Sequence, residues 1–204
     1  MLTKKKIGLM GGTFDPIHYG HLVAAEEARI NFNLSKVIFI PAGNPPHKKD
    51  YPVTDAEHRY IMTALAVNSN PFFEVSRVEI DREGYTYTVD TLKWFKEKYK
   101  DAVEIFFISG ADAILDILTW KKVEEVMNYC TFIAATRPGY TSEQLERKVK
   151  EVKEIYGKEI FVLEVTGMAI SSTEIRKKVK NGQSIKYLVP EAVEYYILKY
   201  NLYR

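Results

Sequence analysis

Three glycines, an aspartate and two histidines lie close together near the N-terminus, in the segment GGTFDPIHYGH (residues 11–21). The segment follows the apolar run KIGLM and precedes an amphipathic stretch, so we expect a strand, a turn and a helix in that order. Glycines let the backbone approach a ligand closely, and a helix N-terminus offers N–H groups and a positive dipole end to phosphate oxygens. The segment therefore predicts a phosphate-binding turn.

Two other interpretations of this segment stay open. His18 and His21 are three residues apart and share one helix face, so with Asp15 they could supply three metal ligands. The two histidines could instead only stabilise a turn. Glycines beside Thr13 suit phosphate oxygens better than zinc, although their spacing matches neither the dinucleotide fingerprint nor a Walker loop. No other histidine or cysteine cluster in the sequence completes a tetrahedral site, so phosphate is favoured.

A second candidate anion site lies far along the chain, in ISSTEIR (residues 170–176). Ser171 and Glu174 fit a capping box, so the segment could simply begin a helix. Arg176 follows Ser172 by four residues and points along the same helix face. Hydroxyls, helix N–H groups and a guanidinium could therefore converge on one anion. From these residues alone, both interpretations remain.

The elements that must position these residues alternate between strand and helix. Short apolar runs rich in Ile, Val and Phe predict strands at 6–10, 36–40, 72–75, 104–109, 130–135 and 160–165. Helical patterns lie between them at 20–32, 55–68, 88–99, 121–128 and 142–156. Thr54 with Glu57 and Thr141 with Gln144 fit capping boxes. The alternation predicts an α/β fold with a parallel sheet.

The C-terminal part has a different pattern, with two helices and no strand between them. Asn181-Gly182 is expected to end the first helix, and Pro190 suits the first turn of the second. No repeat or low-complexity linker divides the chain. We therefore expect residues 1–204 to form a single domain, with 171–204 as its C-terminal helical part.

Composition excludes several classes of protein. The 204 residues are 46% hydrophobic, and 29 Lys and Arg nearly balance 27 Asp and Glu, so the net charge of +2 does not favour nucleic-acid binding. No apolar run approaches the ~20 residues of a membrane span, and the N-terminal run is too short for a signal peptide. The single cysteine, Cys130, offers no disulfide framework. A cytoplasmic protein without a membrane partner is expected.

The two segments resemble motifs of one protein family. GGTFDPIHYGH is similar to the G-x-F-D-P-x-H-x-G-H signature of the nucleotidylyltransferase superfamily, and ISSTEIR is similar to its I-S-S-T-x-I-R element. The resemblance implies the nucleotidylyltransferase fold, a Rossmann-like parallel sheet with helices on both faces. It also implies that His18, His21 and Arg176 are catalytic. His21 would lie nearer the α-phosphate, and Arg176 would hold the leaving pyrophosphate.

Four further segments look like those of bacterial nicotinate mononucleotide adenylyltransferases: PAGNPPHKK (41–49), YTYTVDTL (85–92), GADAILDILTW (110–120) and VPEAVEYYILKYNLY (189–203). The resemblance implies adenylyl transfer from ATP to nicotinate mononucleotide, giving deamido-NAD and pyrophosphate. Tyr85 and Thr86 depart from the family pattern, which has a proline and a serine there. The alternatives are phosphopantetheine adenylyltransferase of coenzyme A biosynthesis and a non-catalytic nucleotide-binding protein on the same scaffold.

The resemblance carries over to individual positions. The residues implied for ATP are Gly11, Gly12, Thr13, Phe14, His18, His21, Gly110, Asp112, Ile170, Ser171, Ser172 and Arg176. Those implied for nicotinate mononucleotide are Asp15, His47, Lys48, Thr88 and Trp120, with the Trp120 ring stacked on the pyridine.

Each of these roles has a structural alternative. Trp120 could pack in the core, Asp112 could cap a helix, and His47 and Lys48 could be solvated loop charges. Asp15 could fix the loop. Mg²⁺ is expected to arrive with ATP rather than at a dedicated protein site. We expect a monomer or a homodimer.

Overall fold

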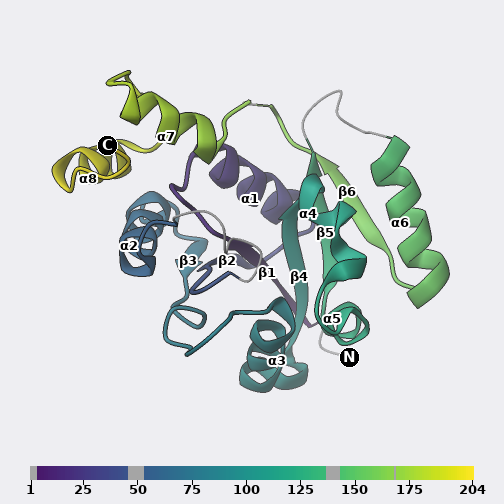
Figure 1. Cartoon of the computed structure of the whole chain (residues 1–204). Coiled ribbons are helices and arrows are strands. Elements are labelled where there is room, and N and C mark those ends of the chain that lie inside the picture. Colours follow the sequence, from purple (N-terminus) through teal and green to yellow (C-terminus); the bar gives the residue numbers. More distant parts are fainter. Residues whose placement is uncertain (1–3, 46–52, 137–142, 168) are drawn as a thin grey trace.

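The computed structural model describes residues 4–45, 53–136, 143–167 and 169–204. A six-stranded sheet forms the centre of the molecule, and helices cover both of its faces (Figure 1). This arrangement confirms the predicted α/β class and the predicted cover on both faces. Among the described residues, no helix has the length and apolar character needed to cross a membrane.

All neighbouring strands of the sheet run parallel, in the order β3-β2-β1-β4-β5-β6. The chain leaves β1 toward β2 on one side and leaves β4 toward β5 on the other. The carboxyl ends of β1 and β4 therefore form the topological switch point, where open α/β sheets bind ligands. The strands are β1 (Lys5–Gly12), β2 (Lys36–Pro41), β3 (Phe73–Val75), β4 (Val103–Gly110), β5 (Thr131–Thr136) and β6 (Ile160–Glu164).

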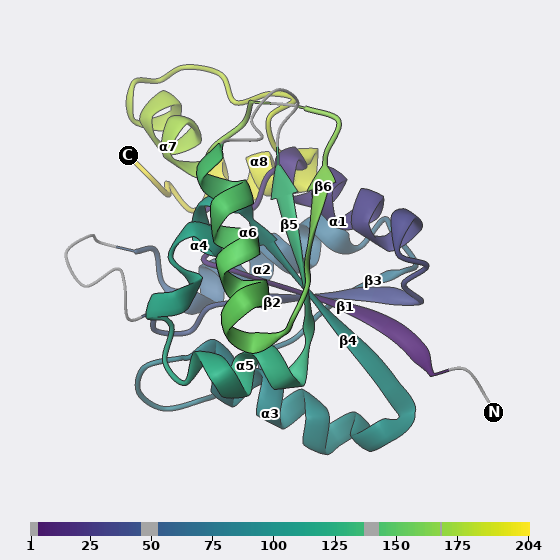
Figure 2. The same cartoon turned by 90° about the vertical axis from the view of Figure 1, so that its right-hand side faces the viewer.

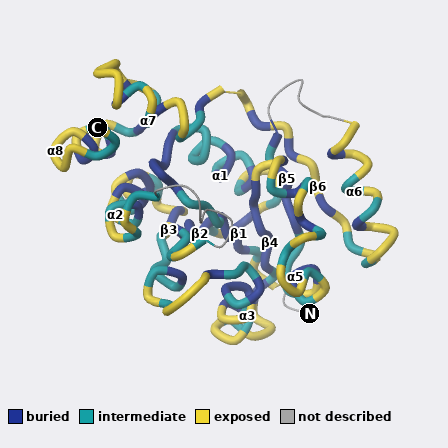
Figure 3. The backbone as a smooth tube through the Cα atoms, viewed as in Figure 1, coloured by how far each residue is buried: buried dark blue, intermediate teal, exposed yellow. Residues whose placement is uncertain are grey.

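The helices divide between two buried apolar clusters, one on each face of the sheet. Successive β1 residues serve opposite faces, with Leu9 in one cluster and Met10 in the other. One face carries α1 (Tyr19–Asn31), α2 (Ala56–Val67), α7 (Ser172–Lys180) and α8 (Glu191–Lys199). The other carries α3 (Thr88–Tyr99), α4 (Ala111–Leu115), α5 (Val123–Tyr129) and α6 (Glu143–Tyr156). Figures 2 and 3 show the buried strands between these helical layers.

The helix ends match the predicted signals only in part. Asp55, not Thr54, caps α2, because its side chain accepts from the Glu57 N–H at 2.9 Å. The predicted cap at Thr54 is therefore wrong, since the Thr54 carbonyl and N–H bind other parts of the chain. Ser171 caps α7 as predicted, accepting from the Glu174 N–H at 3.2 Å. Thr141 lies outside the described residues.

The C-terminal helices end and begin close to the expected places. Asn181 is the C-cap of α7, and Gly182 follows it with a left-handed φ of 65°, as a helix stop requires. Pro190 stands at the N-cap of α8, just before the first turn, and its carbonyl accepts from the Val193 and Glu194 N–H groups.

Gly43 shows how closely the loops at the carboxyl edge of the sheet are packed. A Cβ atom at this position would overlap the backbone carbonyl of Glu79. Next to it, the Thr86 N–H donates to the Asn44 carbonyl at 3.0 Å. The loop after β2 and the segment 79–86 are therefore joined through their backbones.

We expect Gly43→Ala to destabilise the fold by about 3 kcal/mol, because backbone cannot give way as a side-chain tip can. Urea unfolding measures the change. Gly110→Ala is the matched control, since nothing lies within 4 Å of a Cβ there and its φ is −66°. Equal unfolding midpoints for the two variants would contradict the prediction.

Candidate active site

The GGTFDPIHYGH segment ends β1 and crosses the carboxyl edge of the sheet. A Cβ at Gly11 would lie 3.0 Å from the Phe107 ring, and one at Gly12 would lie 2.8 Å from the Phe14 ring. Phe14 is buried and has a left-handed φ of 50°. Side chains at the two glycines would therefore displace the aromatic rings that pack beneath the turn, which leaves the backbone as the exposed surface here.

The two histidines of this segment stack on each other at the start of α1. His18 is the N-cap residue, and its ring centroid lies 3.7 Å from that of His21, with 27° between the planes. The His18 backbone N–H donates to Nδ1 of His21 at 3.3 Å. Because Nδ1 of His21 accepts, the neutral ring carries its proton on Nε2 and can donate it to a ligand.

Protonation of His21 is unfavourable in this arrangement. Burial, and secondly the neighbouring His18, lower the pKa of His21 well below its usual value of 6.5. His21 is therefore neutral at pH 7 in the protein alone. An anion beside the ring would favour the imidazolium, so the pair is suited to respond to a phosphate.

The second predicted segment lies directly against the first, although about 150 residues separate them in sequence. The Ser172 hydroxyl donates to the Pro16 carbonyl at 2.8 Å, and Nη1 of Arg176 donates to the Asp15 carbonyl at 2.7 Å. Ile170 is buried, and its carbonyl lies 3.8 Å from a Cβ built at Gly20. The start of α7 thus lies beside the start of α1.

The serines of α7 are already engaged within the chain. Ser172 gives its hydroxyl proton to Pro16, so in this state its oxygen can only accept. Ser171 accepts from Glu174 as a helix cap, which leaves its own O–H able to donate to an anion. Of the two predicted phosphate contacts, Ser171 is therefore the better placed chemically.

Asp15 fixes the turn between the two segments. Its carboxylate accepts from the Tyr203 hydroxyl at 2.8 Å through Oδ1 and from the Thr54 N–H at 3.3 Å through Oδ2. The side chain is only 5% exposed. Both oxygens are thus engaged inside the protein, which matches the loop-fixing alternative; contact with the acceptor nucleotide stays a prediction.

A cavity of about 380 Å³ opens at the switch point between the ends of β1 and β4. Trp120 stands in its wall, with its ring edge-on to Phe107 and Phe132 at centroid distances of 6.3 and 6.0 Å. Five residues predicted for the two substrates line this one space: Gly11, Gly12, Thr13, Thr88 and Trp120.

Other predicted residues lie around the cavity rather than in its wall. Gly110 is the exposed N-cap of α4, and Asp112 is exposed in its first turn; their neighbours Ser109 and Ala113 line the cavity. The histidine pair and Arg176 lie on the side of α1 and α7. The predicted His47 and Lys48 lie outside the described residues.

Arg59 is a buried residue that sequence reasoning missed. Its guanidinium donates to the carbonyls of Thr54 at 2.8 Å, Thr13 at 2.8 Å and Gly43 at 3.1 Å. The side chain is 1% exposed, and burial lowers its pKa. Arg59 lies one turn before Met62 on the buried face of α2. A single cationic residue on an otherwise largely apolar helix face is the sequence pattern that could have indicated it.

Glu79 is the second residue that the sequence analysis missed. It is buried in the cavity wall, and its Oε1 accepts from the Thr91 hydroxyl at 2.7 Å. Burial raises the pKa of this carboxyl. No local pattern in the sequence marks it, because its partner Thr91 comes from α3.

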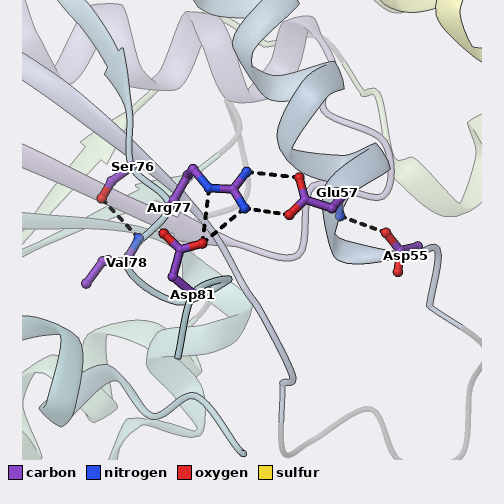
Figure 4. Close-up of polar contacts among 6 residues, drawn as sticks. All are labelled: Asp55, Glu57, Ser76, Arg77, Val78 and Asp81. Atoms are coloured by element: carbon purple, nitrogen blue, oxygen red, sulfur yellow. Dashed lines mark hydrogen bonds and ion pairs between the residues drawn. The ribbon is translucent and has the colours of Figure 1, made fainter. Parts of the chain in front are cut away.

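An ion-pair cluster links α2 to the segment that carries Glu79. Arg77 donates to both Glu57 carboxylate oxygens, at 2.9 and 2.5 Å, and to Asp81 at 3.1 Å (Figure 4). These groups are exposed enough that the pairs contribute little stability. They do place the segment 76–81 against the first turn of α2, next to the cap at Asp55 (Figure 4).

The donor set of the site suits anions rather than a resident metal ion. Within residues 4–45, 53–136, 143–167 and 169–204, no group of three or more His, Cys, Asp or Glu side chains could hold a metal. Two stacked imidazoles at the start of α1 lie here instead, with a guanidinium of α7 bonded to the turn before them. The arrangement can bind a polyphosphate and neutralise charge on it.

The cytidylyltransferase-like family model matches residues 9–178, which include both segments and the sheet between them. The chain therefore belongs to the cytidylyltransferase-like family.

More specific relatives cover almost the whole chain. A protein of Thermoanaerobacter sp. (strain X514), named probable nicotinate-nucleotide adenylyltransferase, is 57% identical over 98% of this chain and 94% of its own. A protein of Moorella thermoacetica with the same name is 60% identical over 98% of this chain and 92% of its own. Among solved structures, nicotinic acid mononucleotide adenylyltransferase of Plasmodium falciparum, complexed with NaAD, matches with a TM-score of 0.78. It is 25% identical over 98% of this chain and 97% of its own.

The lowered pKa of His21 predicts how stability depends on pH. Between pH 6.5 and the lower pKa of His21 in the folded state, only the unfolded chain binds the proton. The contribution of His21 to the free energy of unfolding is therefore fully present above pH 6.5 and is lost as the pH falls. We expect acidification from pH 7.5 to 5.5 to cost the wild type about 1 kcal/mol more than His21→Gln. Urea unfolding at the two pH values measures this difference, and parallel losses in both proteins would refute it.

Proposed function

We propose that this chain transfers the adenylyl group of ATP to nicotinate mononucleotide, releasing pyrophosphate and forming the dinucleotide deamido-NAD. One observation carries the proposal. The two anion-binding segments, 11–21 and 170–176, meet beside a cavity at the switch point of the sheet. The names of relatives at 57% and 60% identity over nearly the full length support the choice of acceptor.

The reaction needs alignment and charge neutralisation rather than a protein nucleophile. The phosphate of the acceptor nucleotide is already an anion, so its oxygen attacks the α-phosphorus of ATP directly. The bond between the α- and β-phosphates breaks, and pyrophosphate leaves. Such transfers depend on positioning the reactants and on stabilising charge where it develops.

The side of α1 and α7 is assigned to ATP. His21 donates Nε2–H to the α-phosphate. His18, whose ring stacks on that of His21, contacts the triphosphate beside it. Arg176 and Ser171, at the start of α7, hold the leaving pyrophosphate. Ser172 and the backbone at Ile170 belong to the same assignment by resemblance. The backbone of Gly12 to Phe14 lies along the phosphates, and Gly110 and Asp112 lie by the ribose.

The cavity is assigned to the acceptor. Its size suits a small ligand, and Trp120 offers an aromatic surface to the pyridine ring. Thr88 begins α3, so the positive end of that helix faces the same cavity and favours the nicotinate carboxylate. Asp15, His47 and Lys48 belong to the same assignment by resemblance.

Four further assignments, on the metal ion, the domain and oligomeric state, the location and the partners, accompany the proposal. Mg²⁺ enters on the ATP phosphates and lowers their charge when bound, held mainly by phosphate and water. Residues 1–204 act as one domain, as a monomer or homodimer. The location is the cytoplasm, supported by the single cysteine. The protein acts on small molecules rather than nucleic acid or membranes.

A panel of acceptors tests the function. We expect pyrophosphate release from ATP to show the highest kcat/KM with nicotinate mononucleotide, below it the amide nicotinamide mononucleotide, and none with phosphopantetheine. Preference for phosphopantetheine would instead assign the chain to coenzyme A biosynthesis. ATP binding without release on any acceptor would mark a nucleotide-binding protein.

His21→Ala is expected to lower kcat about a hundredfold, because it removes one donor from the charge that develops on the α-phosphate. Steady-state pyrophosphate release measures it. His58→Gln is the control: His58 bonds Tyr196 at 2.9 Å on α8 and takes no part in the proposed site. A near-normal kcat in His21→Ala would show that His21 does not stabilise the charge on the α-phosphate.

A further inference from the structure

The last turn of the chain reaches the phosphate-binding segment. Tyr203, the penultimate residue, donates its hydroxyl to Oδ1 of Asp15 at 2.8 Å, across 188 positions of sequence. Figure 1 shows the C-terminus beside α8 and near α2. Nothing in the resemblance or in the pocket assigns a part in the reaction to this tyrosine.

The conformation of the turn is specific. Tyr203 has a left-handed φ of 66°, which is uncommon for a bulky residue and is kept where the surroundings hold it. The Leu202 N–H donates to the Ile197 carbonyl at 3.0 Å, so the turn folds back onto α8. Leu202 and Tyr203 also pack against the apolar cluster beneath α1 and α2. The hydroxyl is thus presented to Asp15 by a well-supported backbone.

Asp15 is the residue at which the two anion-binding segments join. Its backbone carbonyl accepts from Arg176, and the next carbonyl, that of Pro16, accepts from Ser172. The orientation of these two carbonyls therefore sets where the start of α7 lies. Tyr203 and the Thr54 N–H hold the Asp15 carboxylate, and with it the peptide that bears the carbonyl.

The charge on Asp15 makes the tyrosine contact important. Asp15 as a residue is 5% exposed, so its carboxylate depends on protein donors in place of water. Arg59 lies near enough to interact with it, but the Arg59 guanidinium donates its hydrogen bonds to three backbone carbonyls. Loss of the Tyr203 hydroxyl would leave one backbone N–H, at 3.3 Å, as the carboxylate's hydrogen-bond donor among the described residues.

We propose that Tyr203 is a positioning residue for ATP: through Asp15 it orients the carbonyls that place Arg176 and Ser172. Tyr203 and Asp15 do not line the acceptor cavity, so the main effect is expected on the ATP side. The inference rests on the proposed function, and it gives Asp15 a role on the ATP side.

Tyr203→Phe tests the proposal, because it removes one oxygen and keeps the ring. We expect the KM for ATP to rise and kcat to fall about tenfold, which is the rate equivalent of about 1.4 kcal/mol. The KM for nicotinate mononucleotide should stay unchanged. Tyr195→Phe is the matched control, since that ring is 66% exposed on the same C-terminal segment.

Two further measurements separate positioning from general stability. A purely structural role would lower the melting temperature and the active fraction, and leave the KM for ATP as in the wild type; that result overturns the proposal. So would wild-type kinetics in Tyr203→Phe. In a double-mutant cycle with Asp15→Asn, the two losses should be strongly non-additive, and full additivity would also overturn it.

Failure of the function and failure of this inference give different results. A wild type that releases no pyrophosphate refutes the proposed reaction. ATP titration by calorimetry does not depend on turnover, and Tyr203→Phe should still bind ATP about tenfold more weakly than the wild type and Tyr195→Phe. Equal ATP affinity in the three proteins overturns the positioning role.

Discussion

The buried guanidinium of Arg59 is the contact on which the arrangement of the site depends. Two loops converge at the carboxyl edge of the sheet and give three backbone carbonyls to this side chain: Thr13 in the loop after β1, and Gly43 and Thr54 in the connection between β2 and α2. Burying a carbonyl without a hydrogen-bond donor costs free energy, so the three hydrogen bonds from Arg59 stabilise the close approach of these segments. Asp15, which begins the next set of contacts, follows two residues after Thr13. The contacts that join the segments 11–21 and 170–176 therefore begin two residues from a carbonyl that Arg59 holds.

The site has two parts that come from different regions of the chain. The side proposed for ATP comprises α1 near the N-terminus and α7 near the C-terminus, joined through the carbonyls of Asp15 and Pro16. The cavity assigned to the acceptor is lined largely by residues 79–121 and touches the glycine turn at its edge. A change in the cavity wall can thus alter the acceptor without moving the histidine pair.

Much of the fold was predictable because buried parallel strands leave plain apolar runs. All six strands and the main helices appear within about two residues of their predicted ranges. The two segments stood out in the sequence because each holds its polar groups in a few consecutive residues; the structure brings them together, and their roles stay predictions. Arg59, Glu79 and Tyr203 were not, since their partners are carbonyls and side chains brought near only by the fold. The cap at Asp55 was missed for a similar reason: Thr54 has the right residue type, but its backbone is used by Asp15 and Arg59.

The contact between Tyr203 and Asp15 has a consequence for synthesis of the protein. A ribosome makes the chain from the N-terminus, and domains begin to fold as they emerge. Here the turn assigned to ATP is made 188 positions before the hydroxyl that secures it. All six strands precede residue 165, so the sheet can pair on the nascent chain before Tyr203 has been made. The side assigned to ATP gains its Tyr203 contact only afterwards, and a chain that stops before Tyr203 would lack this contact.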